Sequence, residues 1–126
     1  MKNKQAFTMK DYFPPSDFTK CNPPCKKSDM HPETLCKLNN ARHIAGIPFV
    51  LNSAYRSPAH DRARGRSGTG AHTLGRAVDI RCHADDTRWK IITAAIEAGF
   101  TRIGVADSFV HVDDSPTHAQ GVVWTY

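Results

Sequence analysis

Residues whose side chains could bind a metal or take part in catalysis are concentrated in the segment SGTGAHTLGRAVDIRCHADD, which spans residues 67–86. His72 and Asp79 stand seven residues apart there, on either side of Gly75 and Ala77. Asp79 is unusual because it interrupts AVDIRC, which otherwise has the composition of a strand, and a carboxylate in such a strand needs a partner. That partner could be an arginine, a set of backbone donors or a metal ion.

Strand alternation separates the chemical side chains of AVDIRC from its core side chains, because successive strand residues point to opposite faces of a sheet. One face is predicted to pack in the core, and the other is predicted to carry Asp79. The two sets are Val78, Ile80 and Cys82 on the core face, and Ala77, Asp79 and Arg81 on the opposite face.

The segment SFVHVD, residues 108–113, shows the same division. Its valines are predicted to face the core, and its opposite face then carries His111 and Asp113. If the two strands are neighbours in one sheet, Asp79 and His111 converge, and His72 approaches from the loop before the first strand. Two histidines and one carboxylate suit zinc, and three protein ligands leave a fourth position for water.

Two helices are predicted around these strands. The first begins with Asp29 and Pro32 and ends at Gly46, because a capping residue, a first-turn proline and a terminal glycine mark helix boundaries. The second begins at residues 86–87, where Asp or Thr provides the cap, and runs through Ala98. Its apolar face is predicted to contain Trp89, Ile92 and Ile96.

The remaining segments complete a single predicted domain over residues 1–126, since a chain of this length suits one domain. Residues 1–30 are predicted to form an irregular arm, and residues 56–71 a long loop of the kind that is usually functional or mobile. The predicted anchors of the arm are Phe7, Tyr12, Phe13 and Phe18. The predicted strands are IPFVLNSA at 47–54, GRAVDIRC at 75–82, RIGV and SFVHVD as a hairpin, and GVVWTY at 121–126.

Composition narrows the range of partners. A net charge of +5 and a pI of about 9.2 suit nucleic acid, an anionic cell wall or a membrane surface, and are also common without such a partner. No apolar run approaches the roughly 18–20 residues that span a bilayer. The first residues, MKNKQAFTMKDYF, lack the apolar stretch of a signal peptide. We therefore expect synthesis in the cytoplasm, no membrane partner and a monomer.

The four cysteines are Cys21, Cys25, Cys36 and Cys82. Without a secretion signal, disulfides are not expected, and buried free thiols are predicted instead. A structural zinc site made by Cys21, Cys25, His31 and Cys36 is an alternative, although this spacing matches no common zinc finger well.

Taken together, the motifs resemble the peptidase M15 family, the zinc D-alanyl-D-alanine carboxypeptidases and related phage endolysins, and most closely its M15-like C-terminal domain branch. AHTLGRAVDI resembles the family signature H-x-x-G-x-A-x-D, SAYRSPAHD resembles its S-x-Y-R-S-P segment, and FVHVD resembles its third-ligand strand. The resemblance covers residues 31–126, approximately. It implies a small α+β domain with a mostly antiparallel sheet and helices packed on one face, as in hedgehog and D-Ala-D-Ala peptidase folds.

The resemblance also implies roles for individual residues. His72, Asp79 and His111 would hold one zinc ion per chain. Arg56 matches the arginine thought to hold a carboxylate or carbonyl of the substrate, and its two-pronged hydrogen bond is one that lysine cannot copy.

Two positions depart from the family pattern. Gly70 replaces a serine, so one hydrogen bond to substrate or backbone is missing. Ser108 stands where other branches place an acidic general base, and the base is then predicted to be Asp113, ahead of Asp107. Asp113 could instead orient a ligand histidine.

The resulting expectation is a zinc peptidase that hydrolyses peptide bonds in peptidoglycan stem peptides. Without a leader or a wall-binding module, the chain resembles a phage endolysin, released late to act at the cell wall. The bond cut stays open between the L-alanyl-D-glutamate endopeptidase and D-alanyl-D-alanine carboxypeptidase types. The alternative is an inactive, zinc-containing module that binds the wall or builds a virion. A nucleic-acid binder is not expected, because only the arginine-rich loop supports it.

Overall fold

The computed structural model describes residues 8–126, so the predicted anchor Phe7 lies outside the part described. The helices are α1 (Ser16–Thr19), α2 (Pro32–Ala45), α3 (Pro58–Ala63) and α4 (Asp85–Ala98), with single-turn helices η1 (Lys27–Asp29) and η2 (Ala71–Leu74). The strands are β1 (Leu51–Ser53), β2 (Ala77–Arg81), β3 (Arg102–Val105), β4 (Phe109–Asp113) and β5 (Val122–Thr125). No helix in this part of the chain is both long enough and apolar enough to cross a bilayer.

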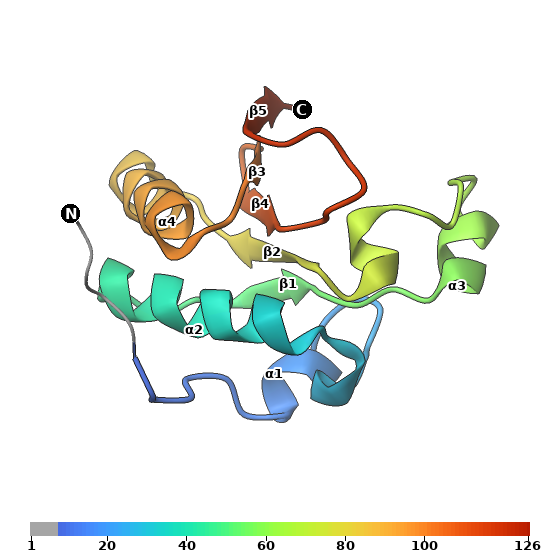
Figure 1. The fold of residues 1–126 in the computed structure, drawn as a ribbon, viewed down its shortest axis with the longest axis horizontal. Coiled ribbons are helices and arrows are strands. Elements are labelled where there is room, and N and C mark those ends of the chain that lie inside the picture. Colours follow the sequence, from blue (N-terminus) through green and yellow to red (C-terminus); the bar gives the residue numbers. More distant parts are fainter. Residues whose placement is uncertain (1–7) are drawn as a thin grey trace.

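The five strands form one sheet in the order β1-β2-β4-β3-β5. All neighbours are antiparallel except β3 and β5, which run parallel. Helices α2 and α4 lie next to each other against this sheet, whereas α3 stands apart beyond the end of β1 (Figure 1). The predicted α+β class and mostly antiparallel sheet are confirmed.

The hydrophobic core lies between the sheet and the pair α2 and α4. Five inward side chains of β2, β3 and β4 are at most 1 % exposed, and they pack with residues of both helices. The strand contribution is Val78, Ile80, Ile103, Val110 and Val112, and the helix contribution is Leu38, Ala41, Ile91, Ala94 and Ala95. The predicted core faces of β2 and β4 are therefore confirmed.

The predicted apolar face of α4 is wrong at Trp89 and Ile96, whereas its third member, Ile92, is half-buried against the core. Trp89 is 71 % exposed and Ile96 is 53 % exposed, whereas Ile91, Ala94 and Ala95 are buried. The small alanines let α4 approach α2 closely, and this contact turns the bulkier side chains outward. The N-cap is Ala84, which makes no side-chain capping bond.

Helix α2 has its predicted ends but not its predicted cap. Pro32 occupies the first turn, and Gly46 ends the helix with a φ of 69°. The cap is His31, whose side chain accepts a hydrogen bond from the Glu33 amide. Asp29 instead belongs to η1, where its carboxylate accepts a bond from the Lys26 amide.

The predicted loop at 56–71 contains a helix. Ser57 caps α3 by accepting a bond from the His60 amide at 3.0 Å, and Pro58 follows in the first turn. Serine followed by proline is a helix-start signal that the composition of this segment obscured.

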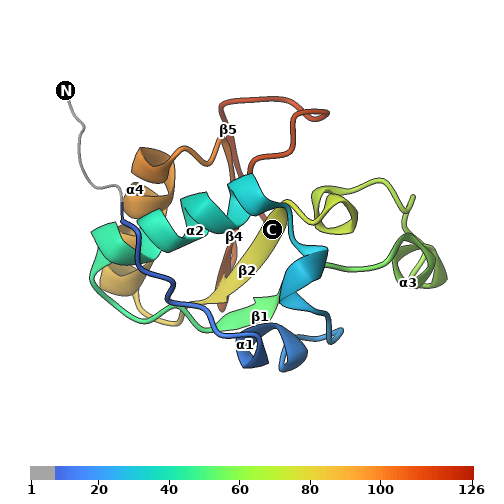
Figure 2. The same ribbon diagram turned by 60° about the horizontal axis from the view of Figure 1, so that its bottom comes forward.

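The N-terminal arm first lies against α2, where the Thr8 and Tyr12 amides donate to Asn40 and Asn39, and then brings α1 to the free edge of β1 (Figure 2). Phe13 and Phe18 are buried, as predicted, and hold the arm to the core. The Asn22 amide donates to the Asn52 carbonyl at 2.9 Å, which fixes the end of α1 beside β1. The long predicted strand at 47–54 is reduced to β1.

Candidate metal centre

His72, Asp79 and His111 form the candidate metal-binding group found among residues 8–126, with their ligand atoms within 4.8 Å of one another. Asp79 on β2 is directly opposite His111 on β4, and His72 comes from η2. The Asp79 Oδ1 atom lies 3.0 Å from His111 Nδ1 and 3.4 Å from His72 Nε2. The predicted convergence of these side chains is therefore present in the structure.

Each histidine is held so that one particular ring nitrogen faces the centre. His72 Nδ1 lies 2.7 Å from the Ala54 carbonyl, which leaves Nε2 toward Asp79. His111 is reversed, because its Nε2 lies 2.6 Å from Asp113 Oδ2 and its Nδ1 faces Asp79. A carbonyl or carboxylate that accepts the second ring N–H is the usual means of orienting a histidine ligand. The donor set and its orientation therefore fit a zinc ion.

The electrostatics of the centre favour a positive charge. Burial raises the pKa of Asp79, but hydrogen bonds from His111 and His72 outweigh it and hold the pKa far below its usual value. Burial lowers the pKa of His111, but its bonds with Asp113 and Asp79 outweigh it and raise the pKa above the usual value. The same carboxylates would stabilise a metal cation at this place.

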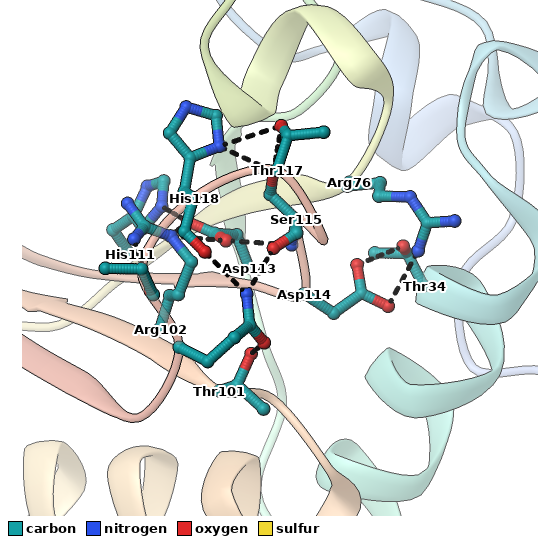
Figure 3. Close-up of polar contacts among 12 residues, drawn as sticks. Thr34, Arg76, Thr101, Arg102, His111, Asp113, Asp114, Ser115, Thr117 and His118 are labelled. Atoms are coloured by element: carbon teal, nitrogen blue, oxygen red, sulfur yellow. Dashed lines mark hydrogen bonds and ion pairs between the residues drawn. The ribbon is translucent and has the colours of Figure 1, made fainter.

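Asp113 is fully buried, and both of its oxygens are occupied (Figure 3). Oδ2 faces His111 Nε2 and accepts a bond from Arg102 Nε at 3.2 Å, while Oδ1 accepts a bond from the Ser115 amide at 3.0 Å and lies 2.9 Å from Arg102 Nε. A general base must reach the proton that it removes. These contacts fit the alternative role, in which Asp113 orients His111, better than the predicted role of general base.

Asp107 lies at the exposed turn between β3 and β4, where its carbonyl accepts a bond from Arg88. The register places the pair Arg81 and Phe109 between this turn and the metal centre. The structure thus brings the three predicted ligands together, and brings neither Asp107 nor an open Asp113 carboxylate to them.

Arg56 is joined to the metal centre through its backbone, because its amide donates to the His72 carbonyl at 3.1 Å. Its side chain is 15 % exposed and is held by Asp61 Oδ1 at 3.4 Å and Ser53 Oγ at 3.2 Å. Asp61 on α3 is buried and also accepts a bond from the Gly68 amide. Sequence reasoning missed Asp61, and the signal that could have found it was the capped helix start SPAHD.

Two cavities adjoin the centre. The first, called here the loop cavity, has a volume of about 430 Å³ and is lined by residues that include Arg56, Asp61, Arg66 and His72. The second, called the strand cavity, has a volume of about 630 Å³ and is lined by residues that include Arg56 and Asp79. Arg56 therefore stands where the two cavities meet, each of which contains one metal-ligand residue.

The backbone at Gly75 explains why the signature has a glycine at this position. Its φ is +70°, and a Cβ atom there would lie 2.4 Å from the Asp29 carbonyl. The His31 amide donates to the Gly75 carbonyl at 2.8 Å. The backbone of the arm thus passes directly over the segment that joins His72 to β2.

A family model for peptidase M15 matches residues 11–113, which includes the arm and ends on the last residue of β4. This chain belongs to the peptidase M15 family. A search of curated proteins found no match to it. The M15 domain begins about twenty residues earlier than the resemblance at 31–126 suggested, because the arm is part of the packed unit.

The cysteines differ from their prediction in one respect. Cys21, Cys25 and Cys82 are buried, but Cys36 on α2 is exposed. Burial raises the pKa of Cys21 to about 12. His31, the fourth member of the alternative zinc site, is bonded to the Glu33 amide and to Arg76, and within residues 8–126 this cysteine set forms no metal-binding group.

Proposed function

We propose that this M15 peptidase is a zinc enzyme that hydrolyses peptide bonds in peptidoglycan stem peptides. The observation that carries the proposal is the convergence of His72 Nε2, the Asp79 carboxylate and His111 Nδ1, with the second nitrogen of each histidine already bonded. A zinc ion bound there supplies water activated at neutral pH and polarises the scissile carbonyl.

The protein's own residues orient the two histidines and bind the substrate. Ala54 and Asp113 fix the two imidazole rings, and Arg102 neutralises the buried Asp113. Arg56 presents a guanidinium at the junction of the two cavities, where it can hold a substrate carboxylate or carbonyl with two hydrogen bonds. Its anchors, Asp61 and Ser53, hold this guanidinium in place before substrate arrives.

The setting proposed for this activity is the bacterial cell wall. The net charge of +5 suits an anionic wall polymer. We propose that the protein acts there as a phage endolysin, as a monomer, with one zinc ion per chain.

Purified protein should contain one zinc ion per chain and should lyse cell walls, releasing new amino termini that identify the bond cut. A chelator should abolish lysis, and added zinc should restore it. Arg56→Lys should keep the zinc and lose about 10–100-fold in kcat/KM, because lysine cannot form the paired bonds. Metal-free protein that lyses walls at the full rate would contradict the zinc mechanism.

The burial of Asp113 and the serine at position 108 favour one alternative, a zinc-containing M15 domain that binds walls or builds a virion without cutting. The same assay separates the two proposals. Zinc-loaded protein that sediments with walls and releases no new amino termini would support the binding module.

A further inference from the structure

The strand cavity extends away from the metal centre over the edge of the sheet. Asp79 lines it on the side of the metal centre, and Asn22 and Asn52 line it together with Lys20 and Arg81. The cavity is therefore built by the end of the arm after α1, by β1 with the residues on either side of it, by β2, and by Phe109 at the start of β4.

The arm is fixed where it contributes to the cavity. Phe18 in α1 is fully buried, and the Asn22 amide is bonded to the Asn52 carbonyl of β1. Lys20 lies between these two fixed points. On the other side of β1, the Arg81 amide donates to the Val50 carbonyl at 2.8 Å. The backbones that carry both cations are thus held by the fold.

The charges of the cavity are unbalanced. Lys20 and Arg81 are exposed, and neither side chain forms an ion pair or hydrogen bond with any residue of the described chain. The acid that lines the cavity is Asp79, which is committed to the two histidines. In contrast, Arg102 is paired with the carboxylate of Asp113. The strand cavity therefore offers positive charge to a ligand.

The two cavities are joined at Arg56, one on the His72 side and the other on the Asp79 side of the metal centre. A substrate that placed its scissile bond at the centre would find room for further residues in both directions. Removal of a single terminal residue needs room for only that residue on one side of the scissile bond, whereas a cavity of about 430 Å³ lies on the His72 side here and one of about 630 Å³ on the Asp79 side.

We propose that the strand cavity is a subsite for an acidic residue of an extended peptide that continues on both sides of the cleaved bond. Lys20 and Arg81 bind the carboxylate of that residue, and the polar side chains of Asn22 and Asn52 border it. The part of this inference that concerns cleavage rests on the proposed function, and the part that concerns binding does not.

The test uses two peptides of stem-peptide composition, blocked at both ends, which differ only in whether one acidic residue carries a free carboxylate or its amide. Zinc-loaded protein should bind the carboxylate peptide about tenfold more tightly by calorimetry, and less so at high salt. The double variant Lys20→Gln and Arg81→Gln should lose this preference and retain its zinc. The matched control is Lys90→Gln with Arg64→Gln, which removes one lysine and one arginine from exposed positions outside both cavities.

Cleavage supplies the second readout. The blocked carboxylate peptide should be cut internally, and kcat/KM should fall about three- to tenfold in the double variant but not in the control. Equal binding of the two peptides, or an equal loss of preference in the control, would overturn the subsite. Cleavage only of peptides with a free terminal carboxylate would overturn the extended substrate. If no peptide is cut at all, the proposed function fails, and the calorimetry still decides whether the cavity selects carboxylates.

Discussion

The two faces of the sheet use the same strands for opposite purposes. On the face toward α2 and α4, Val78 and Val110 are completely buried among apolar side chains. On the other face, Asp79 and His111 come from the same two strands and stand opposite each other at the metal centre. Along β2 and β4, one residue packs in the core and the next faces the metal centre. Substitutions at neighbouring positions should therefore have different effects, one on stability and the other on metal binding.

The face that carries the metal centre has a buried polar layer of its own. Asp113 and Arg102 lie next to His111 (Figure 3). Asp113 is as buried as a core residue, but it is held by an ion pair with Arg102 and not by apolar packing. Such a layer stabilises only when every partner is present, since a buried charge left alone is costly. Substitution of a residue that would touch the metal should therefore change chiefly metal binding, whereas substitution of Asp113 or Arg102 should change both metal binding and stability.

The largest effect is expected for His72→Ala, which removes a ligand without touching the core. Metal content should fall from one per chain to nearly none, and peptidase activity should fall by about 10³-fold or more. The chelator-treated variant should melt slightly below chelator-treated wild type, because the buried Ala54 carbonyl loses its bond from His72 Nδ1. Metal content that stays at one per chain would show that the ligand assignment is wrong.

Asp113→Asn tests the polar layer. If Asp113 orients His111, zinc affinity should fall about 10–100-fold, because the amide supports the imidazole less well than the carboxylate. If Asp113 is the general base, zinc should stay bound while the rate falls about 10²–10⁴-fold. Asp107→Asn at the exposed turn is the control and should change neither quantity.

Ile80→Ala tests the packed face next to the ligand Asp79. The free energy of unfolding should fall by about 2–5 kcal/mol, because a cavity opens in a core position that is 1 % exposed. The folded fraction should still bind one zinc per chain, as measured after removal of unfolded protein. Val123→Ala on β5, where the side chain is 62 % exposed, should cost less than about 0.5 kcal/mol. Loss of metal from folded Ile80→Ala protein would contradict the separation of the faces.

The smallest effect concerns thiol reactivity, which should follow burial. Cys36 is exposed and should be alkylated within the native protein, whereas Cys21, Cys25 and Cys82 should react only on unfolding. Denatured protein from a rapidly alkylated reducing lysate should show four free thiols, counted by mass spectrometry. Two or fewer would contradict the expectation that no disulfide forms.

Local patterns were sufficient to predict the central strands and the convergence of His72, Asp79 and His111. The period of two in β2 and β4 separates valine from histidine and aspartate, and the pairing of Asp79 with His111 follows once the strands are neighbours. Both long helices were also predictable in extent, because Gly46 and Gly99 end them.

Features that depend on contacts distant in sequence could not be predicted in this way. The buried face of α4 is selected by its packing on α2, not by the positions of its largest side chains. The environment of Asp113 depends on Arg102 from β3, eleven residues earlier along the chain. The strand cavity depends on Lys20 and Arg81, which come together only because the arm lies along β1.

The contact at Gly75 and the packing of the arm together limit how far the chain can be shortened. Every motif of the family resemblance lies after residue 50, yet the backbone at Asp29 and His31 rests on Gly75, and Phe13 and Phe18 complete the core from further upstream. A fragment trimmed to the motifs would keep all three candidate metal ligands in its sequence and lose the surface against which the loop after His72 is formed. Truncation tolerance should therefore end upstream of Phe13, and a fusion partner would need to be joined before that residue for the domain to fold intact.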